Sequence, residues 1–110
     1  MRGLVLALAL GLAPSLALAA DPAPPSFDGQ ALFSEKCAMC HGKVGMGTGL
    51  LGRRVQPAEL TQRTDLQADY VVQAARMGIG NMPAIPRGEV SDPQLRAIAE
   101  WLAKGPGGRR

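Results

Sequence analysis

The chain has 110 residues, of which 46% are hydrophobic and 19% are charged, with a formal net charge of +3. This length and composition predict a single globular domain. Aromatic residues make up only 4% of the chain and no run of Lys or Arg exceeds a pair, which argues against nucleic-acid binding. Because so few aromatic side chains are available to fill a core, we expect another bulky group to fill part of it.

The first 19 residues have the pattern of a secretory signal peptide. A basic start precedes an apolar run over residues 4–18, and Ala17-Leu18-Ala19 forms a small-residue cleavage site. A membrane anchor is the alternative, but the run is short and is interrupted by Gly and Pro. We therefore predict a signal peptide at 1–19, export to the periplasm, and no stable membrane span after cleavage.

Helix signals begin after a Pro-rich linker at 20–27 and define a domain at 28–104. Asp28 is a good helix-capping residue and precedes a first helix that we expect to end at residue 37 or 40. Its apolar face would bury the side chains of Leu32 and Phe33.

The middle of the chain alternates between glycine-rich and helical patterns. Residues 42–52 are predicted to form a loop, because glycine occurs at five of these positions. One short helical turn is expected over 57–62. The segment that starts at Thr64 fits a capping box, and the helix that follows it should run to Met77 and end at Gly78. The residues expected to face inward on this segment are Leu66, Tyr70, Val71, Ala74 and Ala75.

A second irregular loop is predicted over 78–88, where glycine and proline are frequent. Ser91 then caps a last helix, with Pro93 in its first turn and Lys104 at its end. The apolar face of this helix consists of Leu95, Ile98, Trp101 and Leu102. Residues 105–110 are expected to be a flexible tail. No strand pattern is present in the sequence, so the predicted class is all-α.

The segment Cys37-Ala38-Met39-Cys40-His41 has the spacing of a covalent haem-attachment motif. On a helix, residues three apart lie on one face, so both sulfurs can bond one edge of a single porphyrin. His41 follows at once and can reach the iron as an axial ligand. We therefore expect one covalently bound haem c.

Three other interpretations of these cysteines were weighed. A structural zinc site needs four ligands, and the chain has only two Cys and one His. A thioredoxin-like dithiol would accompany a βαβ pattern, which the sequence lacks. A disulfide across so short a loop would constrain little. The redox dithiol is the alternative that stays open.

A second axial ligand cannot be another histidine of this chain, because His41 is the only one. Methionine is a common alternative in haem proteins. Met82 lies on a loop stiffened by Pro83 and is the preferred candidate, with Met77 as its main rival. Met39 is too close to the attachment turn to reach the opposite side of the ring.

The segment from Gly29 to Lys104 resembles the small class I cytochromes c of bacteria, most specifically in the attachment motif and in Asn81-Met82-Pro83. This resemblance implies an all-α fold of three to five helices wrapped around one haem, with Met82 as the sixth ligand of the iron. It also implies that Gly29 and Phe33 mark the crossing of the first and last helices. The family usually has a proline, whose carbonyl accepts from the axial imidazole, at the position of Thr48, so this chain departs from the pattern there.

The resemblance implies a mono-haem carrier of single electrons between periplasmic redox partners, such as a dehydrogenase, a bc-type complex or a terminal oxidase. The carrier would cycle between Fe(III) and Fe(II) and would not itself be an enzyme. The stretch from Gly45 to Leu95 also resembles cytochrome subunits of flavin-containing, phenol-oxidising enzymes. A cytochrome subunit of a flavin- or quinone-dependent dehydrogenase is therefore the alternative function. The rival from another class is a catalytic protein, either a dithiol oxidoreductase without haem or a haem enzyme with an open sixth site.

Overall fold

The structure, a computed structural model, describes residues 11, 15–23 and 25–109. Its order of elements is α1 (Gly29–Lys36), α2 (Ala38–His41), α3 (Met46–Leu51), the 3-10 helix η1 (Leu60–Gln62), α4 (Ala68–Met77), α5 (Asp92–Ala103) and α6 (Gly105–Gly108). Within the described part there is no strand, only an isolated antiparallel bridge between Ile79 and Met82. The all-α prediction is confirmed, although three short helices raise the number above the three to five expected.

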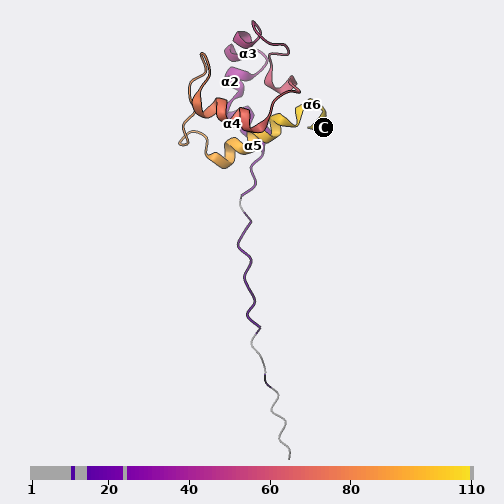
Figure 1. Cartoon of the computed structure of the whole chain (residues 1–110), viewed down its shortest axis with the longest axis vertical. Helices are drawn as coiled ribbons and strands as arrows, with labels where there is room; N and C mark the ends of the chain where they lie inside the picture. Colours follow the sequence, from indigo (N-terminus) through magenta and orange to yellow (C-terminus); the bar gives the residue numbers. More distant parts are fainter. Residues whose placement is uncertain (1–10, 12–14, 24, 110) are drawn as a thin grey trace, which may run out of the picture.

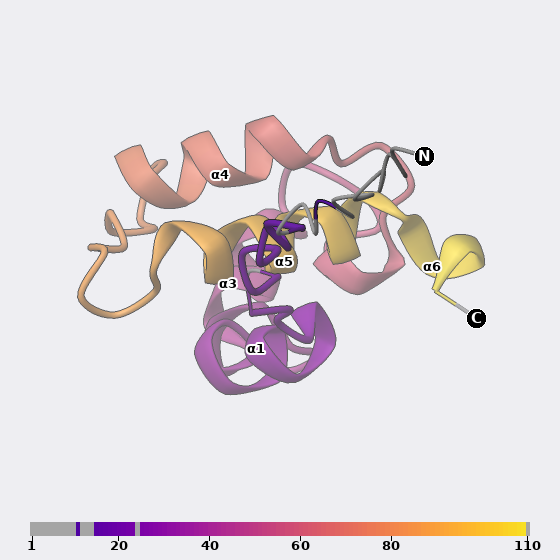
Figure 2. The ribbon, with the colours of Figure 1, turned by 90° about the horizontal axis from the view of Figure 1, so that it is seen from below.

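Helices α1, α4 and α5 form the frame of the domain. Helix α5 packs against both α1 and α4, and Figure 2 shows α4 and α5 running side by side with α1 on the other side of α5. The described residues before Phe27 have no regular structure and lead away from the helices (Figure 1). Much of the expected signal peptide, namely 1–10 and 12–14, lies outside the described residues.

The crossing of α1 and α5 depends on a glycine and an aromatic pair. A Cβ atom added to Gly29 would lie 2.3 Å from the carbonyl oxygen of Ala97 and 2.6 Å from the Cβ of Trp101. The rings of Phe33 and Trp101 lie 5.4 Å apart at an interplanar angle of 41°. The predicted close approach at Gly29 is therefore confirmed, and Phe33 fills the crossing as expected.

Both of the long helices at the crossing begin at capping residues that were predicted. The carboxylate of Asp28 accepts from the backbone N–H groups of Gln30 and Ala31 at 2.9 and 3.1 Å. Ser91 and Gln94 form a reciprocal capping box at the start of α5. These side chains satisfy backbone donors that the first turn of a helix leaves free.

The capping box predicted at Thr64 is wrong, since α4 begins only at Ala68. Residues 64–67 are not helical, and Leu66 among them is buried in the core, with 7% of its surface exposed. Beside it, Arg63 holds the carboxylate of Asp65 in two hydrogen bonds of 2.9 and 2.7 Å. The predicted end of this helix at Gly78 is confirmed, with Gly78 at φ +74°.

The structure differs from two further expectations. The glycine-rich stretch 42–52 contains helix α3, which packs against α2 despite the poor helix propensity of glycine. Residues 105–110 were expected to be a tail, but α6 forms there and contacts η1. The guanidinium of Arg109 lies 4.4 Å from the centre of the Trp101 ring and donates to the carbonyl of Thr61, which ties this end of the chain to the domain.

Candidate functional site

One cavity of about 550 Å³ opens between α1, α2, α3, α4, α5 and the loop after α4. Its inner wall is formed by buried apolar side chains of the core, among them Phe33, Leu66, Leu95, Ile98 and Leu102. A volume of this size and an apolar wall are typical of sites for small molecules and cofactors. The predicted site residues, Cys37, Cys40, His41 and Met82, all line this same cavity.

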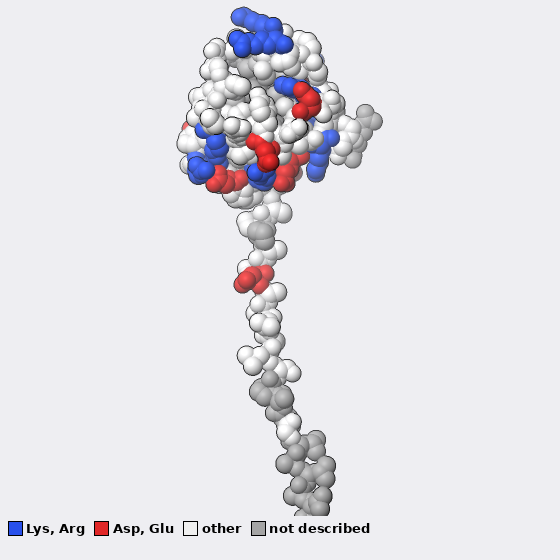
Figure 3. All heavy atoms as spheres, in the orientation of Figure 1, with Lys and Arg blue, Asp and Glu red and all other residues white. Residues whose placement is uncertain are grey.

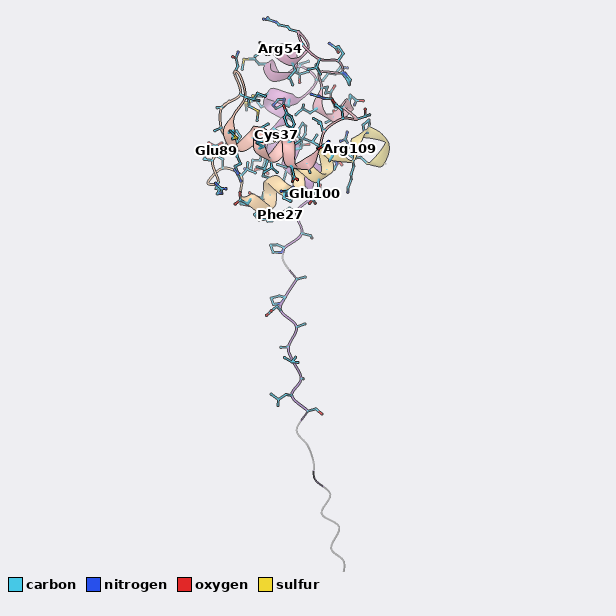
Figure 4. The ribbon with its side chains drawn as sticks, in the orientation of Figure 1. Phe27, Cys37, Arg54, Glu89, Glu100 and Arg109 are labelled. Carbon is cyan, nitrogen blue, oxygen red and sulfur yellow. The ribbon has the colours of Figure 1, made fainter. Side chains whose placement is uncertain are left out.

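The attachment segment occupies a short helical turn that follows α1. Cys37 ends α1 and caps α2, and its carbonyl accepts from the N–H groups of Cys40 and His41 at 3.2 and 2.9 Å. This turn brings positions i, i+3 and i+4 to one face of the chain. Figure 4 shows Cys37 inside the body of the domain. Both thiols are free, and Cys37 is half-buried whereas Cys40 is exposed.

Burial controls the charge of the groups in this segment. Desolvation, with a smaller contribution from Cys40, raises the pKa of the Cys37 thiol to about 11. The Cys37 thiol is therefore protonated at neutral pH. Burial also lowers the pKa of His41, which favours the neutral imidazole, the form that binds metals.

The two ring nitrogens of His41 differ in their surroundings. Nδ1 is buried and has no hydrogen-bond partner among the described residues. His41 itself lines the cavity, so Nε2 is the nitrogen available to a group held there. A ligating imidazole usually donates its other N–H to an acceptor, and Nδ1 of His41 has none among the described residues.

Among Met39, Met46, Met77 and Met82, Met82 is the one that is both half-buried and on the cavity wall. Met82 is half-buried, packs against the core and lines the cavity. Its backbone is held by hydrogen bonds with Ile79 of 2.9 and 3.1 Å. Met39 and Met77 are 90% and 72% exposed and lie outside the cavity wall. Met46, 69% exposed, does line the cavity and replaces Met77 as the rival.

Three arginines on the cavity wall add positive charge to the site. Arg53 and Arg54 follow α3 and have no ion-pair partner among the described residues, whereas Arg63 pairs with Asp65 at 2.7 Å. Figure 4 places Arg54 at the upper edge of the domain, where Figure 3 shows basic side chains with no acidic neighbour. No local sequence pattern indicates Arg63, because its place on the wall depends on the irregular segment before α4.

The donor set and the cavity fit a covalently attached haem. Two thiols, an imidazole and a thioether line one apolar cavity, and these are the groups that hold haem c in proteins. In the part of the chain that the structure describes, no cluster of three or more His, Cys, Asp or Glu side chains offers a different metal site. No helix among the described residues is long and apolar enough to cross a membrane.

The comparisons with known proteins agree with this site. The family model described as "Cytochrome C oxidase, cbb3-type, subunit III" matches residues 27–102, so the chain belongs to this family of c-type cytochromes. It is a small all-α cytochrome that carries one covalently bound haem c.

The chain is also 33% identical over 79 residues to the "4-cresol dehydrogenase [hydroxylating] cytochrome c subunit" of Pseudomonas putida. The match covers 71% of this chain and 60% of the relative, so the chain spans less than two thirds of that protein. No solved structure matches the chain.

Proposed function

We propose that this cytochrome is an exported carrier of single electrons, in which Cys37 and Cys40 hold the haem and His41 and Met82 are the axial ligands. The observation that carries the proposal is that all four side chains line one apolar cavity. When bound, haem iron with His and Met ligands cycles between Fe(III) and Fe(II) at a raised potential. The protein's part is to attach, orient and shield this group.

Each side chain has a separate task in this proposal. The thiols of Cys37 and Cys40 form thioether bonds and prevent dissociation. His41 offers Nε2 on one side of the cavity, and Met82 is held on the loop after α4 by its pairing with Ile79. With both axial positions taken by protein side chains, exogenous molecules are kept from the metal. This favours electron transfer over catalysis at the iron.

The first test is a visible spectrum of the purified protein in both oxidation states, together with extraction by acidic acetone. We expect the spectrum of a low-spin haem and colour that stays with the protein, because thioether bonds resist extraction. Cys37→Ala should lower the yield of holoprotein. Colour that leaves wild-type protein with the solvent would contradict covalent attachment.

The sixth ligand is tested by comparing Met82→Ala with Met46→Ala and Met77→Ala. Loss of the thioether should open the iron to cyanide and lower the midpoint potential in the Met82 variant alone. Met77 serves as the matched control, since it is exposed and lies outside the cavity. Cyanide binding that increases only in Met46→Ala would show that the ligand comes from α3.

A second candidate function is that of a cytochrome subunit in a periplasmic dehydrogenase. The similarity to the cytochrome subunit from Pseudomonas putida favours it. In that case the direct electron donor would be a flavin- or quinone-dependent subunit bound to this chain. Purification from the native periplasm separates the two functions. A free carrier elutes as a monomer, whereas a subunit elutes with a second protein that reduces it when substrate is added.

Export is proposed from the signal pattern at 1–19 and the linker at 20–27. The described residues 15–23 have no regular structure, as expected for a segment that a signal peptidase must reach. Cell fractionation and the intact mass of the holoprotein test the proposal. We expect the protein in the periplasmic fraction with a mature chain that starts at Ala20. A full-length protein in the membrane fraction would show that the segment is kept as an anchor.

A further inference from the structure

The loop and helix that follow His41 pack unusually closely on the attachment segment. A Cβ atom added to Gly45 would lie 2.2 Å from the carbonyl oxygen of Cys40, and one added to Gly47 would lie 2.8 Å from that same oxygen. The Cβ on Gly47 would also lie 3.2 Å from Cε1 of the His41 ring. The start of α3 therefore lies so near the backbone of Cys40 and the edge of the imidazole that Gly45 and Gly47 have no room for a side chain.

A side-chain hydrogen bond holds this arrangement together. The hydroxyl of Thr48, on α3, donates to the carbonyl oxygen of Gly42 at 2.7 Å and is partly buried. The same carbonyl accepts from the N–H of Gly45 at 3.0 Å. Gly42 directly follows His41, so both bonds fix the peptide next to the axial ligand. Thr48 is the only side chain among the described residues that joins α3 to the end of α2 by a hydrogen bond.

We propose that Thr48 is a positioning residue for His41: its hydroxyl ties α3 to Gly42 and so holds Gly47 against the imidazole ring. Cε1 lies between the two ring nitrogens, so the nearby backbone of Gly47 limits the space in which the ring can rotate about its bond to Cβ. The direction of Nε2 toward the cavity is thereby fixed. The inference rests on the proposed function, because it requires His41 to be the ligand.

The consequence concerns how well His41 donates electrons to the iron. Groups outside the first coordination sphere orient a ligating imidazole and set its donor strength. Without the Thr48 hydroxyl, the contact between α3 and the ring loosens and the imidazole samples more orientations. A donor ligand stabilises Fe(III) more than Fe(II). Weaker donation would therefore destabilise Fe(III) more than Fe(II), and the midpoint potential should rise.

The test compares holoprotein carrying Thr48→Val, which keeps the shape but loses the donor, with Thr48→Ser, which keeps the hydroxyl. Thr61→Val is the matched control, since its hydroxyl bonds only to Glu59, two residues away on the approach to η1. Only the part of the hydrogen bond's contribution that differs between Fe(III) and Fe(II) changes the potential, and we take this as about threefold in their equilibrium, less than the whole bond contributes. For one electron this is a rise of about 30 mV in midpoint potential. We expect this rise in midpoint potential in Thr48→Val, together with a broadened ferric EPR spectrum.

A second pair of variants covers the case in which Thr48→Val does not fold. Gly47→Ala places a methyl group against the imidazole, whereas Gly49→Ala, on the same helix, meets nothing within 4 Å. We expect the EPR spectrum and potential to change in Gly47→Ala and to stay at wild-type values in Gly49→Ala.

Three results would overturn the inference. The first is an unchanged midpoint potential and EPR spectrum in Thr48→Val, and the second is an equal change in Thr61→Val. The third is a Thr48→Ser protein that does not keep the wild-type potential and spectrum. A change in unfolding midpoint alone would show that Thr48 is merely structural. The proposed function fails separately, if wild-type protein lacks a His-ligated covalent haem.

Discussion

Gly29→Ala is the sharpest test of the helix crossing that supports the site. The added Cβ atom would lie 2.3 Å from the carbonyl oxygen of Ala97, 2.9 Å from its carbonyl carbon and 2.6 Å from the Cβ of Trp101. None of these atoms belongs to the flexible end of a side chain, so no rotamer change relieves the contacts. Helix α1 must instead move from α5 by about 1 Å to reach ordinary van der Waals separation.

The expected cost follows from the rigidity of both helices. Forcing an extra methyl group into a packed interface typically costs about 1–3 kcal/mol, and contact with backbone atoms places this case at the upper end. Better helix propensity of alanine offsets at most about 1 kcal/mol. We therefore expect a net loss of about 2 kcal/mol, which lowers the Tm of so small a domain by about 10 °C.

The assay is urea and thermal unfolding of the holoprotein, followed by far-ultraviolet circular dichroism. Gly49→Ala is the control, because its Cβ meets nothing within 4 Å and should leave stability unchanged or raise it by up to about 1 kcal/mol. If Gly29→Ala were as stable as Gly49→Ala, the close packing of α1 on α5 would be refuted.

Three further predictions concern the core, the charges and the cofactor. Trp101→Ala removes the ring that packs against Phe33 and should lower the free energy of unfolding by about 3 kcal/mol, measured in urea. Hydrogen bonds from Arg87 and Arg76 hold the pKa of Asp92 below its usual value. The stability that these bonds supply is therefore present above about pH 3.9, the usual pKa of Asp, and is lost as the pH falls through the lower native-state pKa. Asp92→Asn should flatten this acid-side loss in unfolding curves from pH 6 to pH 3, and an unchanged slope would contradict the assignment. Chain made without haem should lose cooperative thermal unfolding and well-dispersed amide NMR signals, because the core residues that line the cavity would lack their packing partner. Dispersed spectra from that chain would show that the helices fold alone.

Local chemistry in the sequence was sufficient for the starts of α1 and α5 and for the end of α4. Asp28, Ser91 and Gly78 act within a few residues of their own position, so caps and stops could be predicted without knowing what packs on them. The spacing of Cys37, Cys40 and His41 is likewise a property of one turn of chain. These features follow from bonds and contacts between near neighbours.

Only the tertiary structure decided the features that depend on distant partners. Helix α3 forms in a glycine-rich stretch because glycines alone fit against the carbonyl of Cys40. Residues 64–67 stay outside the helix because burial of Leu66 and the pairing of Arg63 with Asp65 outweigh a local capping signal. The end of the chain folds back because Arg109 meets Trp101 and Thr61.

The same distinction applies to the choice of the methionine that would be the second axial ligand. Sequence reasoning preferred Met82 with Met77 as its rival, whereas the fold places Met46 rather than Met77 on the cavity wall. The direction in which a loop or helix presents its side chains depends on packing with elements far away in the sequence, which a local pattern does not record. The sequence by itself determined which groups could bind haem, where α1 and α5 begin and where α4 ends. The packing of α1, α3 and α4 around α5 and α2 decided which of those groups meet, because only long-range burial fixes their relative positions.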